Sequence, residues 1–458
     1  MKYSSNSTPQ HAYRWGKTGI KELVPRNAAI FKYTFKALRN RNFALYFSGQ
    51  FITLLGSWMQ QVAMGYLVYK ITDSVFLLSL SVFLTQIPVL FITPFAGVVA
   101  DRFDRKKVLL CTQSAFMVMS AMLAVLTYTG FVNLFWILAI SLAFGITVSF
   151  DAPTRQSIYS KLVPPEDLSN AIALNATAIN GTKFIGPAVG GVIVATVGET
   201  ACFTINFITY WATLIALFMI NADTKPKGVS NANAIAQIKE GISYAKSVLP
   251  IRALLILLAT VCFWGAPLPM LLPAFVGRFG GGSEILGNMM SLIGLGSLAS
   301  SLYLASRKSV LGLGKLITLS SGMLGVGIMV VSLSSNMPLT YFFCVPMGFG
   351  LIATTASCNT LLQSLVDDNK RGRIMSLFTM CFFGMQPLGS LLQGYLSKMF
   401  GMEWVLFVAG AICVVSALVF EYFRPSIRKI ARAIYCKKDN TLPEIAESLK
   451  YTARKSSM

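Results

Sequence analysis

Long apolar runs separated by short polar stretches dominate the chain. They do not follow the 3.6-residue or two-residue periods of half-buried helices and strands. A helix needs about 20 mostly apolar residues to cross the roughly 30 Å hydrocarbon core of a bilayer. Runs of about this length lie near residues 43–69, 75–100, 108–128, 134–150, 171–197, 202–220, 254–275, 286–305, 316–333, 339–362, 374–400 and 405–423. Because lipid admits only helices and closed barrels, we predict an all-α membrane protein with twelve transmembrane helices.

The runs form two sets of six, which predicts two pseudo-symmetric six-helix bundles. We divide the chain into a basic N-terminal tail (1–42), a first bundle (43–220), a linker (221–250), a second bundle (251–423) and a basic C-terminal tail (424–458). In the linker, Ile235, Ile238, Ile242 and Ala245 repeat at helical spacing and predict one amphipathic helix. The first run has no small-residue cleavage site behind it, so we expect a retained span and not a signal peptide.

Weak internal similarity between the halves supports a duplication. The stretch KLVPPEDLSN before the fifth run resembles SLVDDNKRGR before the eleventh. At the same shift of 203 positions, Gly186 aligns with Gly389 and Gly191 aligns with Gly394. Internal symmetry between membrane halves is typical of secondary transporters.

The basic residues are distributed very unevenly. The net charge of +21 raises the question of nucleic-acid binding. All but four of the 39 Lys and Arg, however, fall on one side of a twelve-span chain; the exceptions are Lys70, Lys183, Arg278 and Lys398. By the positive-inside rule both termini then lie in the cytoplasm, and we expect no nucleic-acid partner. The basic amphipathic tails either bind an anionic leaflet or only set the topology, and both interpretations remain open.

The residues that usually carry catalysis or bind metal are sparse. The eight cysteines lack paired metal spacing, and the single histidine, His11, lies in the tail. No Walker-type loop or catalytic constellation is present in the sequence. We therefore expect no enzyme, no metal site and no cofactor.

The charge block at 101–107 carries a family resemblance. The stretch GVVADRFDRKK resembles the signature loop of the major facilitator superfamily, Gly-x-x-x-Asp-Arg-x-Gly-Arg-Arg, which lies between the second and third spans. The matching residues are Gly97, Asp101, Arg102, Arg105 and Lys106. Asp104 replaces the usual glycine, which can change the turn geometry. The resemblance covers about residues 40–425 and implies that this cluster is a conformational latch holding the outward-facing state; the alternative is that its basic residues only fix topology.

The loop that corresponds to the latch in the second half is different. It reads LASRKSVLGLGK and keeps Arg307 and Lys308, but it has no acidic residue. A latch of this kind would therefore be asymmetric.

The fifth run contains GTKFIGPAVGG, in which Gly186, Pro187, Gly190 and Gly191 resemble the motif that marks exporters in this superfamily. A proline removes a helix hydrogen bond, and glycines permit close helix approach. The motif predicts either a bending element in the fifth span or ordinary small-residue packing.

Three further stretches resemble one bacterial branch of the superfamily, which includes enterobactin exporters and macrolide-efflux-like proteins. They are GQFITLLGSWMQQVAMGYLVYKIT, DAPTRQS and LVPPEDLSNAIALN. The resemblance implies a secondary active transporter that exports a small organic molecule, with a siderophore favoured, across the bacterial inner membrane by alternating access. A multidrug or macrolide efflux pump is the alternative, and a non-transporting membrane sensor or scaffold is a third hypothesis. We expect a monomer in the lipid bilayer.

Proton antiport is expected only from family analogy. The sequence places Asp101 and Asp151 at the cytoplasmic edge, so the first half has no expected mid-membrane carboxylate.

The predicted substrate-binding residues are Lys183, Asn180, Gln50, Gln61, Trp264 and Gln386. Lys183 lies near the middle of the fifth span, where a lysine costs at least ~2.5 kcal/mol. It is either a counter-ion for an anionic substrate or one member of a structural pair. The glutamines should face a cavity or another helix because polar groups are costly in lipid. Trp264 suits a ligand that contains rings.

Overall fold

The computed structural model describes residues 36–221, 234–277, 282–307 and 309–437. The first half comprises η1 (Lys36–Arg39), α2 (Arg41–Thr72), α3 (Val75–Arg102), α4 (Arg105–Tyr128), α5 (Leu134–Leu162), η2 (Pro165–Asp167), α6 (Leu168–Thr196) and α7 (Glu199–Met219). The second comprises α8 (Ala234–Ser247), α9 (Leu249–Trp264), α10 (Leu268–Val276), α11 (Ser283–Ser306), α12 (Leu313–Leu333), α13 (Met337–Leu365), α14 (Asp368–Thr379), the π-helical turn η4 (Met380–Gly384), α15 (Met385–Phe400) and α16 (Met402–Lys437).

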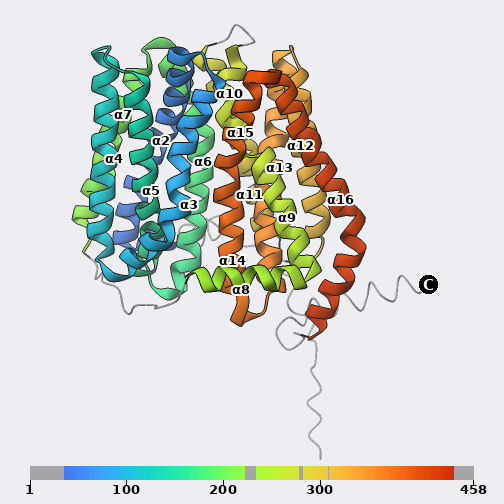
Figure 1. Cartoon of the computed structure of the whole chain (residues 1–458). Helices are drawn as coiled ribbons and strands as arrows, with labels where there is room; N and C mark the ends of the chain where they lie inside the picture. The colour runs from blue at the N-terminus through green and yellow to red at the C-terminus, as the bar shows by residue number, and fades with distance from the viewer. Residues whose placement is uncertain (1–35, 222–233, 278–281, 308, 438–458) are drawn as a thin grey trace, which may run out of the picture.

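The long helices stand roughly parallel, and α8 lies across one end of them (Figure 1). We call that end the linker end and the opposite one the far end. Among the described residues, eleven helical segments are long and apolar enough to cross a membrane. The further helix is α2, whose interior carries several glutamines and is less apolar. The predicted all-α, twelve-span fold is confirmed.

The seventh span is interrupted. Its two parts, α9 and α10, are separated by Gly265, Ala266 and Pro267. Gln386 Nε2 donates to the Ala266 carbonyl at 3.4 Å, and Gln393 Nε2 donates to the Phe263 carbonyl at 3.0 Å. These glutamines of α15 satisfy carbonyls that the break leaves without helical partners. The apolar run at 254–275 predicts a continuous seventh span, and the break departs from that prediction.

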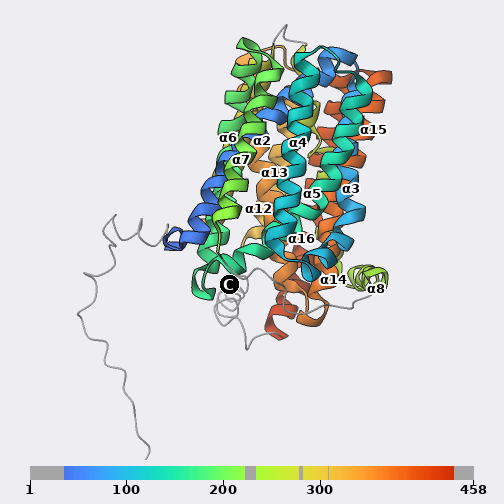
Figure 2. The same cartoon turned by 90° about the vertical axis from the view of Figure 1, so that its left-hand side faces the viewer.

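The two halves pack closely at the far end. Ser283 Oγ at the start of α11 donates to the Gly191 carbonyl of α6 at 3.1 Å. The ring centroids of Phe76 on α3 and Tyr395 on α15 lie 6.3 Å apart. Figure 2, a view turned by 90°, also shows α3 and α15 side by side. The far end of the molecule is therefore closed.

In each half, a short helical element that precedes the first of the six spans contacts the loop that precedes the fifth of those six spans. In the first half, Lys36 Nζ lies 2.8 Å from Asp167 Oδ1, and this hydrogen bond raises the pKa of Lys36. In the second half, α8 packs on α14: the Tyr244 hydroxyl donates to Asp367 at 3.3 Å, and Arg373 pairs with Glu240. Burial, together with the nearby Asp367, raises the pKa of Tyr244. The linker helix therefore belongs structurally to the second half.

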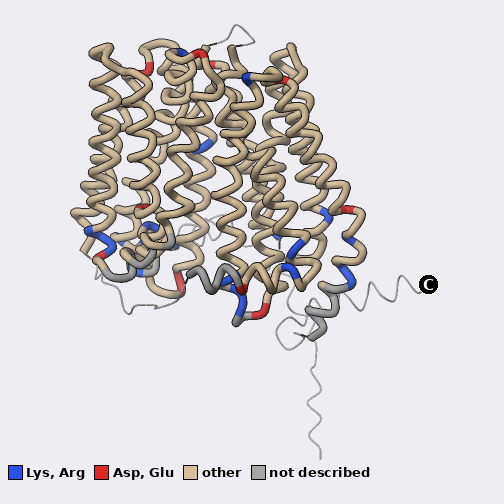
Figure 3. Tube along the Cα trace, in the orientation of Figure 1, with Lys and Arg blue, Asp and Glu red and all other residues tan. Residues whose placement is uncertain are grey.

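Charged residues gather at the two ends of the bundle, and Lys and Arg are most frequent at the linker end (Figure 3). The α16 helix continues to Lys437, beyond the end of the apolar run at 423, and carries several of these basic residues.

Candidate functional site

A central cavity of about 560 Å³ lies mainly among α2, α3 and α5, with smaller contributions from α4, α6 and α7. Small-molecule sites usually measure about 300–1,000 Å³. The second half contributes only Pro269, Met270, Pro273 and Met290 to the wall. The polar residues that line the cavity include Gln60, Gln61, Gln86, Asp151, Arg155 and Asn175. The aromatic residues that line it are Phe116, Phe144, Tyr159 and Tyr210.

An ion pair is built into the cavity wall. Arg155 Nη2 pairs with Asp151 Oδ2 one turn earlier on α5. The Asp151 side chain is 5% exposed and that of Arg155 is 24% exposed. The other carboxylate oxygen of Asp151 accepts hydrogen bonds from Thr112 Oγ1 at 2.9 Å and from Gln113 Nε2 at 2.8 Å. The carboxylate is thus held from α4, whereas the arginine is the more accessible member of the pair.

The expected position of Asp151 at the cytoplasmic edge of the membrane stays a prediction. The helix that forms the fourth span does not end near residue 150, because α5 continues to Leu162. Asp151 therefore lies eleven residues, or about 16 Å along the helix, from the end of α5. The stretch DAPTRQS was noticed only as a family resemblance. Its Asp and Arg at a spacing of four share a helix face, and this signal indicates a pair inside the span.

A second polar group extends the cavity toward the linker end. The Tyr159 hydroxyl lies 2.7 Å from Asn175 Oδ1 and 3.1 Å from Gln50 Oε1. Gln50 is buried and does not line the cavity itself. The structure places it one residue behind the wall, where it orients Tyr159.

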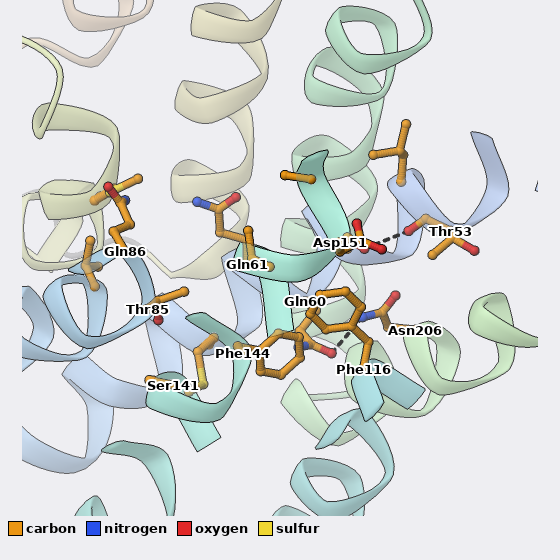
Figure 4. Close-up of a pocket in the computed structure, with 18 of the residues that line it drawn as sticks. Thr53, Gln60, Gln61, Thr85, Gln86, Phe116, Ser141, Phe144, Asp151 and Asn206 are labelled. Atoms are coloured by element: carbon orange, nitrogen blue, oxygen red, sulfur yellow. Dashed lines mark hydrogen bonds between the residues drawn. The ribbon is translucent and has the colours of Figure 1, made fainter. Parts of the chain in front are cut away.

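Two neighbouring glutamines of α2 have different environments. Gln60 Oε1 accepts from Ser120 Oγ at 2.8 Å and from Asn206 Nδ2 at 2.7 Å, and Gln60 is 7% exposed. Figure 4 shows the hydrogen bond from Asn206 to Gln60 as a dashed line. Gln61 is exposed within the cavity wall. Of the residues predicted to bind substrate, Gln61 is the one that lines the cavity.

Lys183 lies outside the cavity lining, at the contact between α6 and its neighbours. Its Nζ lies 5.7 Å from the ring centroid of Trp58, a cation–π geometry. Its carbonyl would lie 2.4 Å from a Cβ on Gly294 of α11. Asn180, one turn earlier, donates to the carbonyl of Ala176 on its own helix at 2.8 Å. The substrate roles of Lys183 and Asn180 stay predictions.

The two candidates from the second half lie next to the seventh-span break. The Trp264 ring packs on Phe263 with centroids 5.2 Å apart, away from the cavity lining. Gln386 reaches the cavity indirectly: its Nε2 lies 3.5 Å from the sulfur of Met270, and Gln86 Nε2 approaches the same sulfur at 3.0 Å. Their roles in substrate binding also stay predictions.

The predicted latch is only partly described. Gly97, Asp101 and Arg102 lie in α3, and their side chains fall outside the described part of the structure. Lys106 Nζ donates to the carbonyl of Ile220, just beyond α7, at 2.8 Å. Arg105 Nε and Nη1 are buried without a hydrogen-bond partner among the described residues.

The residue that departs from the signature loop has a structural role. Asp104 accepts a hydrogen bond from the Lys106 amide at 3.0 Å and caps α4. The φ of Asp104 is −60°, which any residue adopts without strain, so the turn does not require the glycine of the family pattern.

The glycines of the exporter motif are packing positions in this structure. A Cβ on Gly186 would lie 2.5 Å from Trp58 Cβ, and one on Gly190 would lie 2.9 Å from Met59 Cα, both on α2. Gly191 faces α11 instead. α6 is an unbroken helix through Pro187. Bending at this motif stays a prediction.

Known proteins similar to the chain are transporters. The family described as transmembrane secretion effector matches residues 32–453. The staphyloferrin A transporter of Staphylococcus aureus is 26% identical over 84% of this chain and 96% of its own length, and macrolide efflux protein A of Streptococcus pyogenes is 22% identical over 84% and 96%. A bacterial homologue of the lysosomal transporter Spinster, solved inward-facing and unoccupied, has a TM-score of 0.63 at 14% identity over 87% of this chain and 98% of its own. The chain belongs to the transmembrane secretion effector family of major facilitator superfamily transporters.

Proposed function

We propose that the chain exports a small anionic organic molecule of the carboxylate siderophore class by alternating access. The observation that carries the proposal is Arg155, a partly exposed guanidinium in the wall of a cavity of about 560 Å³. A planar guanidinium binds a carboxylate through two parallel hydrogen bonds, which gives both strength and orientation. The similarity to the staphyloferrin A transporter supports the same substrate class.

The charge balance inside the bundle also favours an anion. Among the described residues in and beside the cavity, Lys183 and Arg155 are cationic, and Asp151 supplies the opposite charge beside Arg155. Lys183 has an aromatic partner and no carboxylate within 4.0 Å among the described residues. Unbalanced positive charge in a low-dielectric interior attracts an anionic ligand. When the halves move, Lys183 is the second cation that an anionic substrate would meet.

We propose the proton as the coupling ion, exchanged for the substrate, and the support for this is family analogy. An antiporter of this kind should take substrate into inside-out proteoliposomes faster when their lumen is more acidic than the medium, because protons then leave as substrate enters.

The second candidate function is multidrug or macrolide efflux. Phe116, Phe144 and Tyr210 give the cavity a wall that suits large ring-bearing compounds. The similarity to macrolide efflux protein A supports this alternative.

We further propose that the linker end faces the cytoplasm in the bacterial inner membrane and that the chain works as a monomer and not as an enzyme. The basic residues at the linker end support this orientation. With this orientation, the closed far end seals the cavity from the outside, which suits a conformer that loads substrate from the cytoplasm.

The decisive experiment measures uptake of staphyloferrin A into inside-out proteoliposomes. Arg155→Gln should abolish uptake, Arg155→Lys should retain part of it, and Arg252→Gln, at an exposed position at the linker end, should transport normally. If Arg155→Gln takes up staphyloferrin A as well as the wild type does, the proposed role of Arg155 is overturned. Uptake of a macrolide, but not of staphyloferrin A, would support the second candidate function.

A further inference from the structure

A second cavity, of about 420 Å³, lies within the second half at the linker end. Leu254 of α9, Leu361 and Leu365 of α13, and Phe420 and Ile427 of α16 form its apolar wall. All but Leu361 are buried. This wall does not join the central cavity, whose second-half residues lie between 269 and 290.

The polar residues of this cavity are cationic. They are Lys315 on α12 and Arg424 and Arg428 on α16. Arg424 is partly neutralised, because its Nη2 lies 2.7 Å from Glu421 Oε1. Lys315 and Arg428 are exposed and have no carboxylate within 4.0 Å among the described residues. The cavity therefore combines an apolar interior with a positive edge.

The backbone at this edge adds to the positive potential. The first turn of α12 lines the cavity through Gly314 and Lys315, and its N-cap, Gly312, has no side chain to cap it. Amides at the start of a helix carry partial positive charge and favour an anion. Gly312 has a φ of +80°, a conformation that glycine adopts without strain and that turns the loop into the helix.

The depth of the cavity matches the boundary of a bilayer. Phe420 lies 18 residues after the start of α16 at Met402, which is about 27 Å along the helix. Arg428 lies 26 residues after it, about 39 Å along. With a hydrocarbon core of about 30 Å, the apolar wall lies at the depth of acyl chains and Arg428 at the depth of headgroups.

We propose that this cavity binds one acidic phospholipid. Its phosphate lies between Lys315 and Arg428 at the start of α12, and the upper part of an acyl chain lies against Phe420 and Leu365. A free phosphate would use the cationic edge and leave the apolar wall unused. A neutral lipid would use the wall and leave the two cations unpaired. Basic pockets between transmembrane helices recognise acidic lipid headgroups in this way.

The test is lipid binding to purified full-length protein, measured by native mass spectrometry during titration with phosphatidylglycerol. The variant Lys315→Gln/Arg428→Gln should bind phosphatidylglycerol about 30-fold more weakly, since each surface cation contributes roughly five-fold. The matched control is Lys429→Gln, which removes an exposed cation from the same helix, beside Arg428 but outside the cavity lining. This control should change binding by less than about two-fold for one screened surface charge.

A second variant tests the apolar wall. Ala431→Trp should fill the cavity and weaken phosphatidylglycerol binding while leaving both cations in place. Inorganic phosphate at millimolar concentration should not compete with the lipid. Equal losses in Lys429→Gln and in the double variant would overturn the proposal, because they would indicate only a basic surface. Competition by inorganic phosphate, or unchanged lipid binding in Ala431→Trp, would also overturn it in favour of a phosphate site without lipid specificity.

Discussion

Gly191 of α6 and Gly287 of α11 face each other so closely that a Cβ on either would lie 2.8 Å from the Cα of the other. The two residues belong to different halves of the molecule, and they lie toward the far end. Small residues let transmembrane helices approach until their backbones touch. The closed far end therefore depends on a contact that admits no side chain.

Gly287→Val should weaken this contact. The added side chain meets the carbonyl of Pro187, which would lie 2.5 Å from the new Cβ. Overpacking typically costs about 1–3 kcal/mol, enough to shift a two-state equilibrium strongly. Spin labels at Val197→Cys and Glu284→Cys, both exposed at the far end, should report a longer distance distribution. Gly181→Val is the control, because a Cβ at that position has no neighbour within 4 Å.

Gln60→Leu and Gln61→Leu should separate stability from transport. Gln60→Leu removes the acceptor shared by Ser120 and Asn206, and leaving such buried groups unpaired should cost about 1–3 kcal/mol. Gln61→Leu should leave the melting temperature unchanged and alter the apparent KM for substrate. Thermal unfolding in detergent and proteoliposome uptake measure the two effects. A large loss of stability in Gln61→Leu would show that its exposed position in the cavity wall has been misassigned.

The Asp151–Arg155 pair should show strong energetic coupling. Arg155→Gln leaves the buried Asp151 carboxylate without its ionic partner, which typically costs about 3–5 kcal/mol, and Asp151→Asn leaves the partly exposed Arg155 unpaired at a smaller cost. The double variant Asp151→Asn/Arg155→Gln should recover much of this stability while transport remains absent. A thermal double-mutant cycle measures the coupling. Additive losses would mean that the two side chains act independently.

Lys183→Ala should abolish export while leaving folding intact, and Lys183→Arg should keep part of the activity because it keeps the charge. A purely structural role predicts a different result: Lys183→Ala and Trp58→Ala would then lower the melting temperature together, since each removes one partner of the cation–π contact. Secreted substrate per cell and the melting temperature of purified protein are the two measurements. Full export by Lys183→Ala would remove this residue from the transport path.

Single cysteines should establish the orientation. In a cysteine-free background, Glu166→Cys at the linker end should react with a membrane-impermeant maleimide only in inside-out vesicles. Tyr128→Cys, 83% exposed at the far end, should react from outside intact cells. The reversed pattern would invert the proposed topology.

Hydropathy predicted the fold well because each span must satisfy its backbone internally and so needs a long apolar run. The same signal failed where function interrupts it. Asp151 and Arg155 lower the hydropathy of the fourth span, so the run stopped near residue 150 although α5 continues to Leu162. Hydropathy hid the break between α9 and α10 because Gly265, Ala266 and Pro267 are uncharged and do not end the apolar run, although glycine and proline interrupt helices. Which glutamine of α2 faces the cavity depends on packing against α4 and α7, and no local pattern encodes that.

The wall of the central cavity comes almost entirely from one half of the protein, and the four second-half residues in it are apolar. Recognition and motion are therefore separable traits in this chain. Changes in the first half should alter which molecules are carried, whereas changes in the second half should mainly alter how fast the carrier cycles. Homologues selected for new substrates should then accumulate substitutions around α2 and α5. Substitutions on the surface of the second half should instead follow the lipid composition of the membrane.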